Sequence, residues 1–187
     1  MKKLSTLFLD RDGVINTELP ADYVKSISEF QFEPGVFEAL KILQPFFQYT
    51  IIVTNQRGVG AGIMSDDDLQ TVHRHMLDEF SVHGINIDAI YAATDEDRSS
   101  LKRKPHPYMG QIAQRDFPAI DFSQSLMIGN SSSDMEFGKS LSMITAFVDD
   151  KRKHEGILTL KNADFEADSL YLLAEKFIKE ILPHFHH

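Results

Sequence analysis

Short apolar runs alternate with segments of helical periodicity along most of this chain of 187 residues. Each run is short enough for a strand that is buried on both faces of a sheet. A chain that alternates in this way folds with right-handed crossovers, which predicts a parallel sheet covered by helices on both sides. The predicted strands are residues 6–9, 50–53, 87–91, 126–128 and 144–148.

The helical segments carry their own start signals. Pro34 suits a first helical turn, and apolar residues follow it at helical spacing as far as Leu43. Ser65, with Asp68 three residues later, predicts a capped helix whose apolar stripe extends to Phe80. Further helices are predicted at residues 108–115, 134–141 and 169–181.

We therefore expect a Rossmann-like three-layer α/β sandwich with a mainly parallel sheet. The length fits a single domain over residues 1–187, because ~150 residues per domain is usual. Two stretches interrupt the alternation. Residues 14–32 are predicted to form a small flap after the first strand, and residues 92–105 a loop.

The composition excludes several classes of function. Cys is absent, which rules out disulfides, thiolate nucleophiles and thiolate zinc sites. Lys plus Arg number 19 against 28 Asp plus Glu, and the resulting charge of −9 argues against nucleic acid or an anionic membrane as a partner. A secretory leader and a membrane-spanning apolar stretch of ~18 residues are both missing. We therefore expect a soluble cytoplasmic protein that is a monomer or a weak homo-oligomer.

The first predicted strand ends in two carboxylates, Asp10 and Asp12, followed by Gly13. The carboxyl ends of strands are where α/β sheets bind their ligands. Two close carboxylates repel each other unless a cation joins them, and oxygen-only ligands suit Mg²⁺. The alternative is a strand followed by an ordinary Asp-Gly turn.

The second predicted strand ends in Thr54-Asn55-Gln56, and a loop with several glycines follows at residues 57–62. A hydroxyl group and backbone amides at a strand end can bind a phosphate, and glycine lets the backbone come close to it. The alternative is a simple loop entry.

Two later segments add charge. Lys102, Arg103 and Lys104 form the densest positive cluster of this acidic chain, which would neutralise a phosphate or would simply be a solvated basic turn. The fourth predicted strand is followed by Asn130 and Asp134. Asp134 would complete a metal site or would only cap the next helix.

In this order, each at a predicted strand end, these motifs resemble the haloacid dehalogenase (HAD) superfamily of phosphatases. That family has an Asp-x-Asp motif, a Thr or Ser after its second strand, a Lys and a Gly-Asp-x-x-x-Asp motif. The similarity covers about residues 6–150 and implies a minimal cap domain or none. The segments most similar to the heptose bisphosphate and histidinol phosphate phosphatase branch are residues 10–16, 54–56, 103–105 and 134–135.

The resemblance implies catalytic and metal-binding roles. Asp10 would be the nucleophile that forms an aspartyl-phosphate. Asp12 would act as the general acid and base, and Lys104 would offset charge in the transition state. Magnesium would be held by Asp10, Asp12, Asn130 and Asp134.

The resemblance also implies a substrate site, formed by Thr54, Asn55, Gln56, Arg57 and Arg103. The two arginines are candidates for binding a second phosphate or another acidic group of the substrate. The substrate implied is a small phosphorylated metabolite, foremost D-glycero-D-manno-heptose 1,7-bisphosphate.

Three alternative functions stay open on the sequence. The same motifs would serve a histidinol phosphate phosphatase equally well. A DNA 3′-phosphatase shares the first two motifs, although the net charge of −9 argues against it. A non-catalytic phosphosugar-binding protein would result if Asn130, which replaces the usual Asp, disables turnover.

The second departure from the family concerns zinc. Members of this branch often carry a Cys/His zinc loop just before the Arg-Lys-Pro segment, whereas residues 92–102 contain neither Cys nor His. Carboxylates alone rarely form a closed zinc site. The purified protein is therefore expected to hold no stoichiometric zinc. Elemental analysis after removal of adventitious metal tests this, and a content of about one zinc per chain would contradict it.

Overall fold

The computed structural model of the protein describes residues 3–19, 22–149 and 163–185. Within these residues, six parallel strands form one sheet in the order β3-β2-β1-β4-β5-β6. The predicted α/β class with a mainly parallel sheet is therefore confirmed. The strands are β1 (Leu4–Leu9), β2 (Phe47–Asn55), β3 (Ala89–Ala93), β4 (Leu126–Gly129), β5 (Ile144–Val148) and β6 (Phe165–Ala167).

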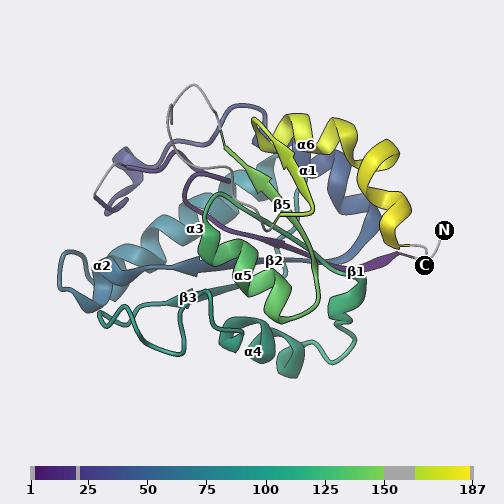
Figure 1. The fold of residues 1–187 in the computed structure, drawn as a ribbon. Coiled ribbons are helices and arrows are strands. Elements are labelled where there is room, and N and C mark those ends of the chain that lie inside the picture. The colour runs from purple at the N-terminus through teal and green to yellow at the C-terminus, as the bar shows by residue number, and fades with distance from the viewer. Residues whose placement is uncertain (1–2, 20–21, 150–162, 186–187) are drawn as a thin grey trace.

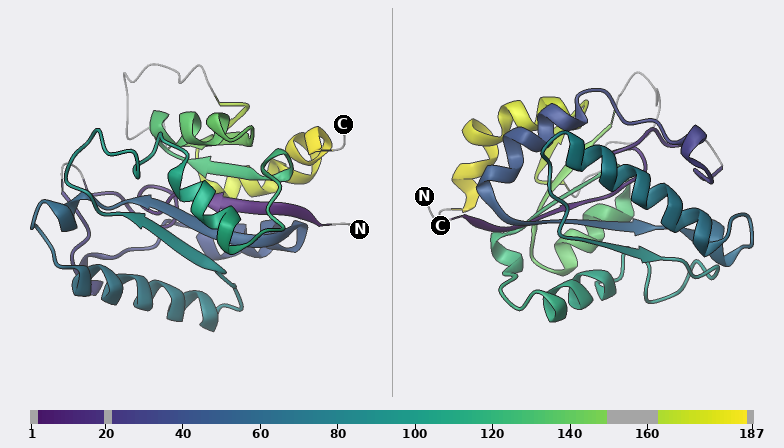
Figure 2. Two further views of the ribbon diagram at one scale, coloured as in Figure 1. Left: turned by 90° about the horizontal axis from the view of Figure 1, so that it is seen from below. Right: turned by 180° about the vertical axis from the view of Figure 1, so that it is seen from behind.

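Helices cover both faces of the sheet (Figure 1). Successive side chains of a strand point to opposite faces, so Leu7 and Leu9 pack in one core and Phe8 in the other. The core of Leu7 includes residues of α1, α3 and α6, and that of Phe8 includes residues of α4 and α5. Figure 2, in the view from behind, shows α3 and α1 on the same side of the sheet. The helices are α1 (Val36–Leu43), α2 (Arg57–Gly60), α3 (Asp66–Val82), α4 (Tyr108–Asp116), α5 (Ser132–Ser140) and α6 (Leu170–Lys176).

Several element boundaries differ from the prediction. β2 is longer than residues 50–53, and β3 lies two residues later than predicted. The reason is pairing: Thr54 and Asn55 continue the ladder, so their partners Ala92 and Ala93 belong to β3 and not to the predicted loop. The carboxylate of Asp88 accepts a hydrogen bond from the backbone N–H of Thr50 (2.7 Å) just before β3 begins.

The regions around β2 and the C-terminus also differ. Residues 57–62, predicted to be a loop, contain the short helix α2. The predicted C-terminal helix, residues 169–181, is α-helical only as far as Lys176 and continues as a π-helical segment, Phe177–Ile181, and a 3₁₀ turn, Leu182–Phe185. The sequence reading missed β6, because three residues at a sheet edge show no usable periodicity.

The flap, residues 14–32, begins directly after β1 and returns to it. The backbone N–H of Thr17 donates to Gln31 O (2.8 Å), and that of Glu33 donates to Ile15 O (2.9 Å), which closes the base of the flap. Phe32 packs against Phe80 of α3 with ring centroids 5.4 Å apart. The flap is therefore anchored beside the carboxyl end of β1.

The strand order has a topological switch point between β1 and β4, at the centre of the sheet. β1 pairs with β2 on one side and with β4 on the other, so the chain leaves in opposite directions from neighbouring strands. Such a switch point opens a crevice at the carboxyl ends of the strands, where ligands bind in α/β proteins. No helix in the described part of the chain has the length and apolar character needed to cross a membrane.

Candidate active site

A cavity of about 180 Å³ lies at the carboxyl ends of β1, β2 and β4. Asp10 follows β1, and its backbone N–H donates to Ile128 O (2.9 Å), which extends the β1–β4 ladder into the site. The flap supplies the opposite wall. The lining comprises Asp10, Asp12, Glu18, Leu19, Asp22, Tyr23, Val24, Thr54, Asn55, Lys104, Asn130, Ser131 and Ser133.

Lys104 links the residue after β1, strand β2 and the first turn of α5. Its Nζ lies 2.7 Å from Asp10 Oδ1 and 2.6 Å from Asp134 Oδ1, and it donates to Val53 O at 2.8 Å. The hydrogen bonds to Asp10 and Val53 use two of the three donors of the ammonium group, and Asp134 adds a close ion pair. The Lys104 backbone is held as well, since the Asn55 carboxamide accepts from its N–H (3.0 Å) and donates to its C=O (3.1 Å).

The buried charges shift one another's pKa. Burial raises the pKa of Asp10, and the nearby Asp134 carboxylate raises it further, to about 7, although Lys104 opposes the change. Burial lowers the pKa of Lys104, but the charges of Asp10 and Asp134 outweigh it and the net shift is upward. Lys104 is therefore a permanent cation, while a further positive charge beside Asp10 would favour the ionised form that nucleophilic attack requires.

Asp12 has the opposite environment. Arg11 Nη2 donates to both of its carboxylate oxygens (2.9 and 3.0 Å), and the amide groups of Asn16 (3.0 Å) and Gln56 (2.7 Å) donate to one each. Burial raises the pKa of Asp12, but Arg11 and these hydrogen bonds outweigh it and lower the pKa overall. Asp12 is thus held as a carboxylate at the cavity wall.

The buried Arg11 links Asp12 to His73 of α3. Arg11 Nη1 lies 3.2 Å from His73 Nε2, and both side chains are nearly inaccessible to solvent. Burial lowers the pKa of His73 to about 4, and the adjacent Arg11 charge contributes to this shift. His73 is therefore neutral and accepts a hydrogen bond from Arg11. Sequence reading missed both residues, because a His on the apolar face of a helix is an ordinary core pattern.

Thr54 and Gln56 are both buried, but they differ in access to the cavity. Thr54 lines it, whereas Gln56 points inward and donates to Thr54 Oγ1 (2.8 Å) as well as to Asp12. Since Gln56 occupies a lone pair of the hydroxyl group, the hydroxyl hydrogen of Thr54 remains available to a ligand. The structure thus places Gln56 behind the predicted substrate site, outside the lining of the cavity.

Asp134 takes the capping role considered from the sequence and also pairs with Lys104. Its Oδ2 accepts from Ser131 N (3.0 Å) and Ser131 Oγ (2.6 Å) in a capping box of α5, while Oδ1 faces Lys104. The side chain is fully buried. Asn130 lines the cavity instead, and its Nδ2 donates to Glu18 Oε2 of the flap (3.1 Å).

Arg57 and Arg103 lie outside the cavity lining but next to it. Arg57 Nε donates to Glu96 O (2.9 Å), and Arg103 Nη1 to Asp95 O (3.4 Å). Burial lowers the pKa of Arg103, and the charges of Arg57 and Arg98 lower it further, whereas Tyr23, which lines the cavity, raises it. The arginines therefore form a positive cluster behind the Tyr23 side of the cavity.

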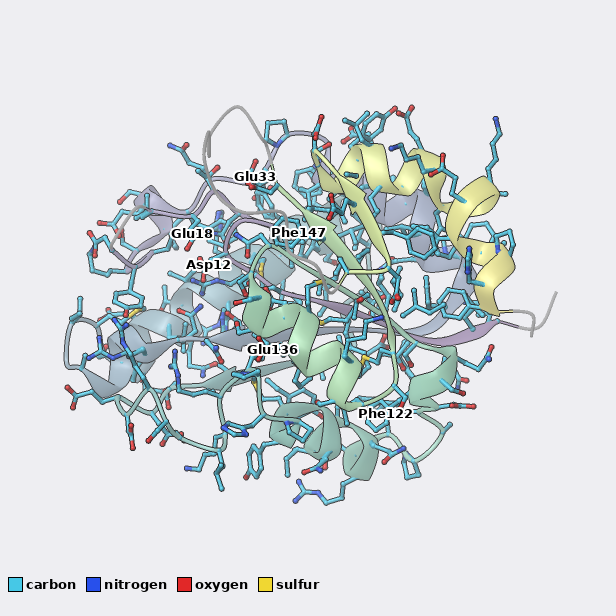
Figure 3. The ribbon with its side chains drawn as sticks, viewed as in Figure 1. Asp12, Glu18, Glu33, Phe122, Glu136 and Phe147 are labelled. Atoms are coloured by element: carbon cyan, nitrogen blue, oxygen red, sulfur yellow. The ribbon has the colours of Figure 1, made fainter. Side chains whose placement is uncertain are left out.

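The flap contributes site residues that sequence reading missed. Figure 3 shows Glu18 and Asp12 at the same end of the sheet, and both line the cavity together with Asp22 and Tyr23. The Tyr23 ring lies against Gly58 of α2, where an added Cβ would come within 2.9 Å of the ring. No periodic pattern marks flap residues, so only the closure of the flap brings them to the site.

The donor set fits a hard divalent cation. The cavity wall carries the carboxylates of Asp10, Asp12 and Glu18 with Lys104 as its cationic member, and oxygen donors of this kind suit Mg²⁺. Within the described residues, no three His, Asp or Glu side chains converge as a preformed metal cluster. Lys104 Nζ forms an ion pair with both Asp10 and Asp134.

A parallel Rossmann-like sheet with an Asp-x-Asp turn, a Thr and a buried Lys at its switch point defines a site for phosphoryl transfer. No family model matches the chain. It is 37% identical over 137 residues to the D-glycero-alpha-D-manno-heptose-1,7-bisphosphate 7-phosphatase of Mycobacterium bovis, covering 73% of this chain and 72% of the relative. The enzyme of the same name from Burkholderia mallei is 33% identical over 169 residues, which cover 86% of this chain and 88% of that relative.

Solved structures agree with these relatives. The D,D-heptose 1,7-bisphosphate phosphatase of B. bronchiseptica, complexed with magnesium and phosphate, superposes with a TM-score of 0.80 at 26% identity, covering 95% of this chain and 99% of that one. The chain belongs to the heptose bisphosphate phosphatase branch of the HAD superfamily and is a phosphoric monoester hydrolase.

The His73 environment predicts a pH dependence of stability. The folded protein keeps His73 neutral down to about pH 4, whereas the unfolded chain takes up this proton near pH 6.5. Between these values the unfolded state binds more protons, so the free energy of unfolding falls by about 3 kcal/mol as the pH is lowered. Urea unfolding of the natural protein and of His73→Gln at pH 7, 5.5 and 4.5 measures this. The natural protein should lose more stability than the variant, and parallel losses would contradict the assignment.

Proposed function

We propose that this protein hydrolyses one phosphate ester of D-glycero-D-manno-heptose 1,7-bisphosphate through an aspartyl-phosphate on Asp10. The contact of Lys104 Nζ with Asp10 Oδ1 at the cavity wall carries the proposal, because it sets a carboxylate nucleophile beside a fixed cation. The relatives from M. bovis and B. mallei, named for this substrate, support the choice of ester.

The first step forms a bond between an Asp10 oxygen and phosphorus and breaks the bond from phosphorus to the sugar oxygen. The departing oxygen needs a proton, and Asp12 is the carboxyl group at the cavity wall nearest in sequence to the nucleophile. Asp12, a carboxylate in the free protein, gives up its pairing with Arg11, Asn16 or Gln56, takes a proton from the solvent and passes it to the departing oxygen. Leaving such a set of donors raises the pKa of a carboxyl group toward the range of a general acid.

The second step hydrolyses the aspartyl-phosphate. Asp12, now ionised again, accepts a proton from water, and the water oxygen attacks the phosphorus of the aspartyl-phosphate. The bond between phosphorus and Asp10 breaks, inorganic phosphate leaves and the Asp10 carboxylate is restored. Asp12 then releases this proton to the solvent, because the low pKa imposed by Arg11 and its neighbours favours the carboxylate form.

Thr54 and Lys104 serve the phosphoryl oxygens. The hydroxyl hydrogen of Thr54 is available because Gln56 already occupies a lone pair of its oxygen. Lys104 offsets negative charge as the phosphoryl group approaches Asp10. Asn55, whose carboxamide holds the Lys104 backbone, acts on this lysine and not directly on substrate.

Magnesium would be held by the Asp10 carboxylate, the Asp12 backbone carbonyl and the Asn130 amide oxygen. When bound, it neutralises charge on the phosphoryl group and on Asp10. Asp134 contributes indirectly in this proposal, since one oxygen holds Lys104 and the other caps α5. The excess of carboxylates in the lining is itself an obstacle to a phosphate dianion unless a cation is present.

The second phosphate of the substrate is assigned to Arg103, with Arg57 and Arg98 beside it. Burial lowers the pKa of Arg103, and the charges of Arg57 and Arg98 lower it further, so an anion placed among these arginines would be stabilised. Tyr23 lies between this cluster and the cavity, which suits a sugar whose two phosphates lie at opposite ends.

Replacing the nucleophile tests the reaction. Asp10→Asn is expected to lower turnover of the bisphosphate by roughly four orders of magnitude or more, because the amide cannot form the covalent intermediate. Phosphate release measures the effect, and thermal unfolding verifies the fold. Asp78→Asn, an equivalent change at an exposed position of α3, should keep full activity. Comparable turnover in a folded Asp10→Asn protein would refute the mechanism.

Replacing Arg103 tests the second-phosphate site. Arg103→Gln is expected to raise KM for heptose 1,7-bisphosphate about tenfold, as expected for the loss of one charge-assisted hydrogen bond. Hydrolysis of p-nitrophenyl phosphate, which has one phosphate, should change little. Lys102→Gln, which removes a neighbouring exposed charge, is the matched control. Equal changes for both substrates would show that Arg103 acts on the reacting phosphate or on the fold.

A further inference from the structure

A flap carboxylate lies directly against the residue that ends β4. Asn130 Nδ2 donates to Glu18 Oε2 at 3.1 Å, although the two residues are 112 positions apart in the chain. Both side chains line the cavity that also contains Asp10 and Asp12. Glu18 therefore contacts an amide that lines the same cavity as the nucleophile.

The chemistry of this contact fixes the direction of the amide. An ionised carboxylate can only accept hydrogen bonds, whereas the carboxamide of Asn130 has a donating and an accepting end. The NH₂ group of Asn130 must therefore face Glu18, and its oxygen is left for another partner. A glutamine at position 18 could donate or accept and would impose no such choice.

Gly13 makes the arrangement close-packed. It adopts a φ of +81°, and a Cβ at this position would lie 1.9 Å from Asn130 Nδ2 and 3.4 Å from Glu18 Oε2. The turn after β1, the flap and the end of β4 thus meet at a single point. Because a glycine backbone packs against the NH₂ group, this end of the amide is enclosed on two sides.

We propose that Glu18 is a positioning residue for Asn130: it holds the carboxamide so that the oxygen, and not the nitrogen, is presented to a divalent cation. The inference rests on the proposed function, which places a cation at this site. A carboxylate at position 130 would present oxygen in either orientation. Asn130 does so only when a partner fixes it, and the flap supplies that partner.

The test measures cation binding without substrate. Mn²⁺, which has the same preference for oxygen ligands as Mg²⁺, is titrated into the protein while free Mn²⁺ is followed by electron paramagnetic resonance. Glu18→Gln is expected to weaken Kd for Mn²⁺ by roughly tenfold, as is common when a partner of a metal ligand is lost. Glu29→Gln removes a charge from the same flap at a residue that pairs with Lys25, and it should leave Kd unchanged.

A double-mutant cycle separates positioning from a general effect of charge or flap packing. In the Asn130→Asp background the ligand no longer needs orienting, so adding Glu18→Gln should leave Kd unchanged or improve it. The side-chain NH₂ signal of Asn130, identified in a ¹H–¹⁵N spectrum by its loss in Asn130→Asp, should shift in Glu18→Gln. Thermal unfolding of all variants verifies the fold.

Each outcome is decisive. Equal weakening by Glu18→Gln in both backgrounds, no weakening in either, or no Mn²⁺ binding by the natural protein would overturn the inference. If the natural protein binds Mn²⁺ and shows the expected cycle but does not hydrolyse heptose 1,7-bisphosphate, the proposed function fails and the positioning role stands. If it hydrolyses the ester while Glu18→Gln binds Mn²⁺ normally, the positioning role alone fails.

Discussion

The ammonium group of Lys104 is the contact on which the site depends. It reaches the end of β1 through Asp10, the end of β2 through Val53 O and the start of α5 through Asp134. The lysine is brought to these segments by a loop that leaves the sheet edge at β3. Removing one partner of such a buried set leaves an uncompensated charge, at a cost of about 3–5 kcal/mol. The same group therefore stabilises the site and prepares it for an anion.

Two aspartates separated by one residue acquire opposite properties from their surroundings. Asp10 is buried beside another carboxylate, which raises its pKa to about 7, whereas Arg11 and two amides lower the pKa of Asp12. A nucleophile whose ionised form depends on a nearby cation is thus paired with a base that is ionised by default. Environments that separate the pKa values of two carboxyl groups in this way allow the two groups to take different chemical roles in one site.

The flap and the loop before Lys104 determine what else reaches the cavity. Short-range contacts hold residues 94–102. In this chain, Asp95 accepts from Ser100 Oγ (2.9 Å) and pairs with Lys102, while Asp97 accepts from Ser99 N (2.8 Å). Local hydrogen bonds of this kind order the loop that carries Arg98 and leads to Arg103. On the opposite wall the flap brings Glu18 to Asn130, so both walls are built from segments without regular secondary structure.

The sequence by itself determined the parallel α/β fold, the strand ends that carry Asp10, Thr54 and Asn130, and the cap of α3, because periodicity and capping are local properties of the chain. It left the cap of α5 as one of two alternatives. It did not determine β6, the inward turn of Gln56, the pairing of Arg11 with His73 or that of Glu18 with Asn130. Those partners lie 62 and 112 positions apart. Their contacts exist only once the flap has closed and α3 has packed on the sheet. Backbone pattern places a residue at an edge of the sheet, and the direction and charge state of its side chain depend on neighbours that only tertiary packing supplies.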